Sequence, residues 1–105
     1  FENFIKFKIV VGTIISVKNN IKARKPSYIL KINFGEKIGI KKTSAQITNY
    51  DFDVLLDRQI VAVTNFPSKN VAGVESEVLI LGALTDMGVK LLKIDEKIQN
   101  GTMIG

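Results

Sequence analysis

The stretch Tyr28-Ile29-Leu30-Lys31-Ile32-Asn33-Phe34 shows the clearest alternation of side-chain character in the chain. Successive side chains of a β-strand point to opposite faces of the sheet, so this period of two predicts a half-buried strand. The side chains predicted to face the core are Tyr28, Leu30, Ile32 and Phe34, and those predicted on the other face are Ile29, Lys31 and Asn33.

The residues after this stretch predict a hairpin. Gly35-Glu36-Lys37 is short enough for the turn, and a second strand is expected over 37–42. Continued alternation would place Ile38 and Ile40 inward, with Gly39 and Lys41 outward. Lys31, Asn33 and Lys41 are then expected to share one exposed face.

Further short segments rich in β-branched residues predict the rest of a sheet. The predicted strands span residues 8–18, 28–35, 37–42, 60–66, 77–83 and 89–94. Short helical turns are expected at 1–7, 44–48 and 53–57. Five or six short strands with a helical element after the third indicate an all-β protein, and among small closed barrels this is the order of the OB-fold, a five-stranded Greek-key barrel. Its 105 residues are predicted to form a single domain (1–105), because two halves would each be too small to bury a stable core.

Composition narrows the function. The chain has 15 Lys and Arg against 10 Asp and Glu, and ten of the basic residues but only two of the acidic ones lie in residues 1–50. This asymmetry favours a polyanionic partner. Cysteine and histidine are absent, which removes the thiolate nucleophile, the commonest metal ligand and the usual general base. No enzymatic activity, cofactor or metal site is therefore expected, and Asp51, Asp53 and Asp57 are interpreted as a solvated acidic surface.

The apolar run of residues 9–17 is too short to cross a bilayer and is expected to be a buried strand. Without cysteine or an export signal, a cytoplasmic protein with no membrane partner is the expectation. Because the chain begins at Phe1 and not at Met, some N-terminal residues are expected to be missing from it.

A basic segment, Lys18-Asn19-Asn20-Ile21-Lys22-Ala23-Arg24-Lys25-Pro26, joins the first two predicted strands. By itself it is equally well explained as a solubilising loop. OB-folds, however, bind ligands through the face of strands 2 and 3 and through the 1–2 and 4–5 loops. This position favours phosphate contacts by nucleic acid. The predicted contacts are Lys22, Arg24 and Lys25 in the loop, with Lys31, Lys41 and Lys42 on the face.

The connection from Phe66 to Ser76 is the second predicted binding loop. It offers one lysine, hydroxyl groups and an amide to sugar or phosphate, but the same residues would suit an ordinary polar connection. Phe66 ends an apolar strand and is expected in the core rather than stacked on a base.

Four motifs, in order, carry a family resemblance: residues 38–48 (IGIKKTSAQIT), 63–67 (VTNFP), 73–79 (GVESEVL) and 100–102 (NGT). They resemble the CsaA-like secretion chaperones of the tRNA-binding-domain family, and the match covers nearly the whole chain. The resemblance implies an OB-fold with short terminal extensions that join a homodimer. It also implies tRNA contacts on the 1–2 loop, on residues 41–44 including Ser44, and around Asn65, Lys69 and Ser76.

Two function classes follow. One is a non-catalytic module that binds tRNA or other structured RNA through basic loops. The alternative, from the family branch, is a chaperone-like binder of unfolded or precursor polypeptides in protein export. In both cases apolar residues at the chain ends predict a homodimer, because an exposed apolar patch usually marks an interface. The predicted interface residues are Phe1, Phe4, Phe7, Ile98, Met103 and Ile104.

Overall fold

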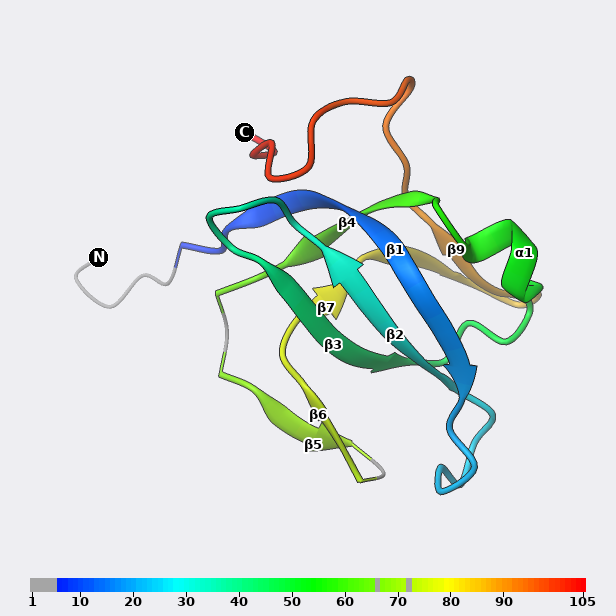
Figure 1. Ribbon diagram of the computed structural model, residues 1–105. Helices are drawn as coiled ribbons and strands as arrows, with labels where there is room; N and C mark the ends of the chain where they lie inside the picture. The colour runs from blue at the N-terminus through cyan, green and yellow to red at the C-terminus, as the bar shows by residue number, and fades with distance from the viewer. Residues whose placement is uncertain (1–5, 66, 72) are drawn as a thin grey trace.

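The computed structural model describes residues 6–65, 67–71 and 73–105, and is built around one five-stranded antiparallel sheet (Figure 1). The strand order is β3-β2-β1-β4-β7, so the fourth strand returns to lie beside the first, which is the Greek-key arrangement. The strands are β1 (Ile9–Asn19), β2 (Tyr28–Asn33), β3 (Ile40–Ala45), β4 (Gln59–Val63) and β7 (Leu79–Ile80).

Two small hairpins and one helix complete the described part of the chain. The hairpins are β5 (Lys69–Val71) with β6 (Val74–Ser76), and β8 (Gly82–Thr85) with β9 (Gly88–Leu91). The helix α1 (Phe52–Leu55) confirms the turn predicted near 53–57. No helix among the described residues is long and apolar enough to cross a membrane.

The sheet is closed into a nearly complete barrel by contacts between β3 and the segment after β6. Glu77 donates its backbone N–H to the carbonyl oxygen of Lys42 at 2.8 Å. The Thr43 hydroxyl donates to the carbonyl oxygen of Val78 at 2.8 Å. Because these bonds satisfy the open edge of β3, the expected OB-fold barrel is confirmed.

The core confirms the alternation predicted for β2. Leu30 and Ile32 are fully buried and Phe34 is 1% exposed, whereas Lys31 between them is exposed. Further aliphatic side chains of the cluster come from β1 (Val10 and Ile14), from β4 (Ile60 and Ala62) and from Val78, which directly precedes β7.

The third strand corrects the sequence-based prediction. It covers 40–45 and not 37–42, and Ile40 is 58% exposed instead of buried. The loop before it is longer than a tight hairpin: Gly39 donates its N–H to the oxygen of Gly35 and accepts the N–H of Phe34. Gly39 adopts a φ of 84°, a conformation outside the strand region, so alternation does not continue from Ile38 to Ile40. Ile38 does pack against the core, as expected.

This register decides which lysines share a face. Lys42 is paired with Lys31, whereas Lys41 is paired with Ile32 and lies in the row of the core-facing side chains. A shift of one residue moves every side chain to the opposite face. The prediction that Lys41 shares the exposed face with Lys31 is therefore wrong, and Lys42 takes that place.

Other predicted boundaries also change. Ser44 and Ala45 continue β3 and do not begin the helical turn predicted at 44–48. The strand predicted at 60–66 ends at Val63, and the one predicted at 77–83 is divided between β7 and the start of β8. Most of the turn predicted at 1–7 lies outside the described residues.

The C-terminal segment adds backbone pairing to the first half of β1. Gly101 donates its N–H to Val11 O at 2.8 Å, and Val11 donates to Thr102 O at 3.0 Å. Gln59 holds the same segment through Ile98, with its Nε2 donating to the Ile98 oxygen at 2.6 Å and its Oε1 accepting the Ile98 N–H at 3.0 Å. Residues 98–104 are therefore part of the folded unit.

Candidate functional site

The loop between β1 and β2 is organised by one buried side chain at its base. Asn20 is 7% exposed, and its backbone N–H donates to the oxygen of Ser27 at 3.0 Å. Its Oδ1 accepts the N–H of Lys22 at 3.2 Å. Asn20 therefore bonds backbone groups of the loop from its buried side. The cationic side chains of Lys22, Arg24 and Lys25 are exposed.

A concave region of about 550 Å³, here called the basic hollow, lies between this loop and the end of β3. Three predicted cations stand at its rim, and below them lie Ser27, which directly precedes β2, and Ser44 on β3. It is lined by Lys22, Ala23, Arg24, Lys25, Ser27, Ser44, Ala45 and Gln46. The structure therefore brings Ser44 together with the loop cations, as the predicted RNA contacts require.

Three lysines on neighbouring strands form a second basic feature, here called the lysine row: Lys18 on β1, Lys31 on β2 and Lys42 on β3. Lys31 is paired with Lys42, and with Ser16 on its other side. Lys18, two residues after Ser16, therefore shares their outward face. All three side chains are exposed. Facing like charges oppose folding, so a bound polyanion would relieve their repulsion.

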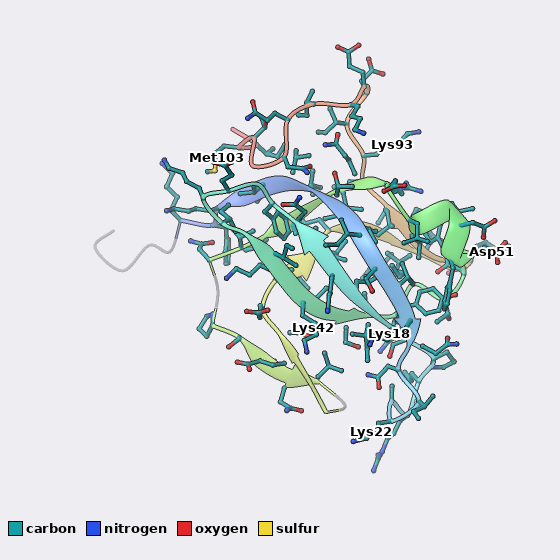
Figure 2. The ribbon with its side chains drawn as sticks, in the orientation of Figure 1. Lys18, Lys22, Lys42, Asp51, Lys93 and Met103 are labelled. Atoms are coloured by element: carbon teal, nitrogen blue, oxygen red, sulfur yellow. The ribbon has the colours of Figure 1, made fainter. Side chains whose placement is uncertain are left out.

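Lys18 and Lys42 lie in the same lower half of the molecule as Lys22, and Lys93 and Met103 lie in the upper half (Figure 2). Lys18 was predicted within both the strand 8–18 and the basic segment, but it was not expected to share the exposed face with Lys31. The signal was the alternation of Ser16, Val17 and Lys18 at the end of β1, which runs to Asn19.

The β5–β6 hairpin lies beside the 1–2 loop. A Cβ atom at Gly73, between the two strands, would lie 3.4 Å from Cδ of Lys22. Lys69 is exposed on β5, where it is paired with Ser76. The two connections that were predicted as binding loops are therefore neighbours in space.

Three other predicted contacts lie in different settings. Ser76 is 6% exposed, and its Oγ accepts the backbone N–H of Ser44 at 3.0 Å. Asn65 lies near the N-terminal end of β1, the far end from the 1–2 loop, where its Oδ1 accepts the N–H of Lys8 at 2.7 Å and its Nδ2 donates to Lys6 O at 2.8 Å. Lys41 is half-buried. Phe66 lies outside the described residues.

A smaller, apolar hollow of about 210 Å³ lies on the other side of the end of β3. Its rim includes Leu79, which is 54% exposed, and Leu84, which is 89% exposed. Met87, 78% exposed, follows Leu84 at the tip of the β8–β9 hairpin. This apolar hollow shares Ser44, Ala45 and Gln46 with the basic hollow.

Sequence comparison places these features in a family. Residues 9–103 match a family model described as "Putative tRNA binding domain". The chain is 32% identical over 109 residues to a methionine–tRNA ligase of Thermococcus onnurineus and 33% identical over 109 residues to that of Pyrococcus horikoshii. Each alignment covers 99% of this chain but only 14% of the ligase, so the chain spans about a seventh of these curated relatives.

Two solved structures match over nearly their whole length. The CsaA chaperone of Picrophilus torridus superposes with a TM-score of 0.91 at 51% identity, covering 95% of this chain and 92% of that one. The CsaA chaperone of Bacillus anthracis superposes with a TM-score of 0.89 at 42% identity, covering 100% and 96%. The matched domain is a binding domain and not a catalytic one. The chain belongs to the tRNA-binding domain family and is CsaA-like within it.

Proposed function

We propose that the protein binds tRNA through a continuous basic surface formed by the basic hollow and the lysine row. The observation that carries this proposal is the meeting of three loop cations and three strand lysines on one side of the barrel. Lys and Arg side chains that neutralise phosphates release condensed counterions, and this release drives association.

Recognition of a folded RNA suits this surface better than the reading of a base sequence. The exposed cations at the rim and on the sheet are suited to phosphate oxygens, which fix position and orientation but carry no sequence information. Double-helical RNA is recognised largely by shape and by its backbone. We therefore propose that the placement of phosphates in folded tRNA selects the ligand.

The residues of this surface divide into contacts and supports. Lys69 on the hairpin extends the contact surface past Lys22. Ser76 and Asn65 act as supports in this proposal, because their polar side-chain atoms already hold β3 and residues 6–8.

A salt titration of binding to total tRNA tests the proposal. Each phosphate contact contributes a slope of about −0.7 to −0.9 to a plot of log affinity against log salt. If all six cations of the basic hollow and the lysine row contact phosphate, a slope of about −4 to −5 per protomer is expected. A slope close to zero would contradict the proposal.

The apolar hollow favours a second activity, the binding of unfolded or precursor polypeptides. Leu84 is 89% exposed beside a hollow lined by aliphatic side chains, and the similar Picrophilus torridus and Bacillus anthracis proteins are described as chaperones. Replacement Leu84→Asp is expected to weaken suppression of aggregation of a denatured client and to leave tRNA affinity unchanged. Loss of tRNA binding with retained suppression would contradict this assignment.

We also propose that the protein forms a homodimer through its chain ends. Phe7, Met103 and Ile104 are 59%, 54% and 38% exposed, and Met103 lies in a bridge with Val10, so these side chains belong to paired segments. Ile98 is half-buried, and Phe1 and Phe4 lie outside the described residues. Light scattering at micromolar concentration is expected to give twice the chain mass, and Met103→Asp with Ile104→Asp to give the monomer mass. A monomeric wild-type protein would refute the proposal.

A further inference from the structure

Polar side chains in and beneath the basic hollow make long hydrogen bonds to one another. Ser27 is 6% exposed, and its Oγ accepts the Ser44 hydroxyl at 3.5 Å. Asn20, 7% exposed, donates from Nδ2 to Ser44 Oγ, also at 3.5 Å. Hydroxyl–hydroxyl bonds are typically about 2.7–2.8 Å and amide–oxygen bonds about 2.9–3.0 Å. Within the described part of the chain, the buried Ser27 hydroxyl is therefore held only by a long hydrogen bond to the half-buried Ser44, which is unfavourable for a buried group.

The three loop cations lie next to these serine hydroxyls. Lys22, Arg24 and Lys25 line the same hollow as Ser27 and Ser44. The loop that carries the cations is fixed relative to the base, because Oδ1 of Asn20 accepts the N–H of Lys22. Hydroxyls below and cations above are the partners that the oxygens of a phosphate accept from.

The shape of the hollow restricts the source of that phosphate. A concave space of about 550 Å³ has the volume of a small-molecule site, roughly 300–1,000 Å³, although it is open on one side. The convex outside of a double helix would contact the rim cations but would not reach Ser27, which is 6% exposed. An unpaired nucleotide fits, because its backbone is free to turn into the hollow.

We infer that the basic hollow is a discrete site for one phosphate group of an unpaired nucleotide. The hydroxyls of Ser27 and Ser44 bind this phosphate from the base, and the loop cations neutralise it. Asn20 is a positioning residue that holds the loop in place. This inference rests on the proposed RNA-binding function. It specifies which part of the RNA, the phosphate of an unpaired nucleotide, binds at the basic hollow.

The test compares adenosine 5′-monophosphate with adenosine in a titration followed by amide NMR at low salt. We expect the nucleotide to shift amides of residues 20–27 and 44–46, and adenosine to leave them unchanged. The double variant Ser27→Ala with Ser44→Ala retains all the cations and is expected to bind the nucleotide at least about tenfold more weakly, because hydrogen bonds to a charged group are lost. The control Thr48→Ala removes an exposed hydroxyl outside the hollow and should bind normally.

The outcomes separate this inference from the proposed function. Unchanged nucleotide affinity in the double variant, or shifts spread over all surface lysines, would overturn the discrete site while leaving tRNA binding in place. Failure of the wild-type protein to bind tRNA would overturn both. Thermal unfolding checks that the double variant folds, and Ser44→Ala alone, at a half-buried position, replaces it if it does not.

Two sources of the phosphate are distinguished by single-stranded oligonucleotides. Tighter binding of a 5′-phosphorylated hexamer than of the same hexamer with a 5′-hydroxyl assigns a terminal phosphomonoester. Equal binding of the two assigns an internal phosphodiester beside an unpaired base. Binding of a blunt duplex as tightly as of the single strands, with the same amide shifts, would overturn the requirement for an unpaired nucleotide.

Discussion

The two halves of β1 lie beside polar side chains from other segments, and the bonds between side chains at the loop end are longer than the bonds from side chains to backbone groups at the terminal end. At the terminal end, where residues 6–8 and 98–104 lie, Gln59 and Asn65 bond backbone groups over 2.6–3.0 Å. At the loop end, where the 1–2 loop begins, the Ser44 hydroxyl is bonded to Ser27 and to Asn20 at 3.5 Å, while the Ser44 backbone N–H donates to Ser76 Oγ at 3.0 Å. Short bonds to backbone groups hold segments together at the terminal end, whereas the side-chain bonds beneath the exposed loop cations are long, as the proposed phosphate site requires.

Charge reversal on the lysine row at the loop end is expected to have the largest effect on tRNA affinity. Lys31→Glu with Lys42→Glu is expected to lower tRNA affinity about 100-fold or more, because two carboxylates then face phosphate on the lysine row. The control Lys93→Glu with Lys97→Glu changes the net charge by the same amount at exposed positions of the C-terminal segment. This control should retain most of the tRNA affinity of the wild-type protein. Filter binding at fixed salt measures both variants.

The same reversal tests whether the two proposed ligands share a site. Polypeptide binding depends on apolar burial and should survive the reversal. Equal loss of both activities would mean one shared site, and loss of neither would mean that this face is not the binding surface. Lys31→Glu with Lys41→Glu should have a smaller effect on tRNA than the Lys42 pair, because Lys41 lies in the core-facing row.

Removing the loop cations should have the next largest effect. Lys22→Ala, Arg24→Ala and Lys25→Ala together are expected to flatten the salt slope by about two to three units per protomer if all three contact phosphate. The melting temperature should hold, because the side chains are exposed on a connection. An unchanged slope in a folded variant would mean that the loop is only a solubilising surface.

At the terminal end, a substitution should alter stability and not ligand affinity. Gln59→Ala removes the partner of both backbone groups of Ile98 and is expected to lower the free energy of unfolding by about 1–3 kcal/mol. Chemical denaturation measures the loss, and tRNA affinity should change less than about twofold. A large loss of affinity in a stable variant would show that this end also contacts RNA.

The smallest effect is expected from Asn65→Ala. The family resemblance predicts a tRNA contact at Asn65, but its amide is already bonded to Lys6 and Lys8. We expect faster amide exchange at Lys8 and less than about a twofold change in tRNA affinity. A tenfold weaker affinity with unchanged exchange would restore the contact role.

Local sequence determined the features whose causes are local. The alternation of β2 follows from the strand period of two, and Leu30, Ile32 and Phe34 are buried as predicted. The basic character of the 1–2 loop follows from its composition. The OB-fold follows from the number and order of short strands, and it is confirmed by the observed strand order.

Tertiary structure decided which of these residues meet. The φ of 84° at Gly39 set the register of β3, so Lys42 and not Lys41 joined Lys31 on the outward face. Burial of Asn20 beneath the 1–2 loop placed cations over Ser27 and Ser44, and hydrogen bonds to residues 6–8 occupied the amide of Asn65. Side-chain pattern reports which faces are apolar, but register and hydrogen-bond partners depend on residues far apart in the chain, and only packing brings those together.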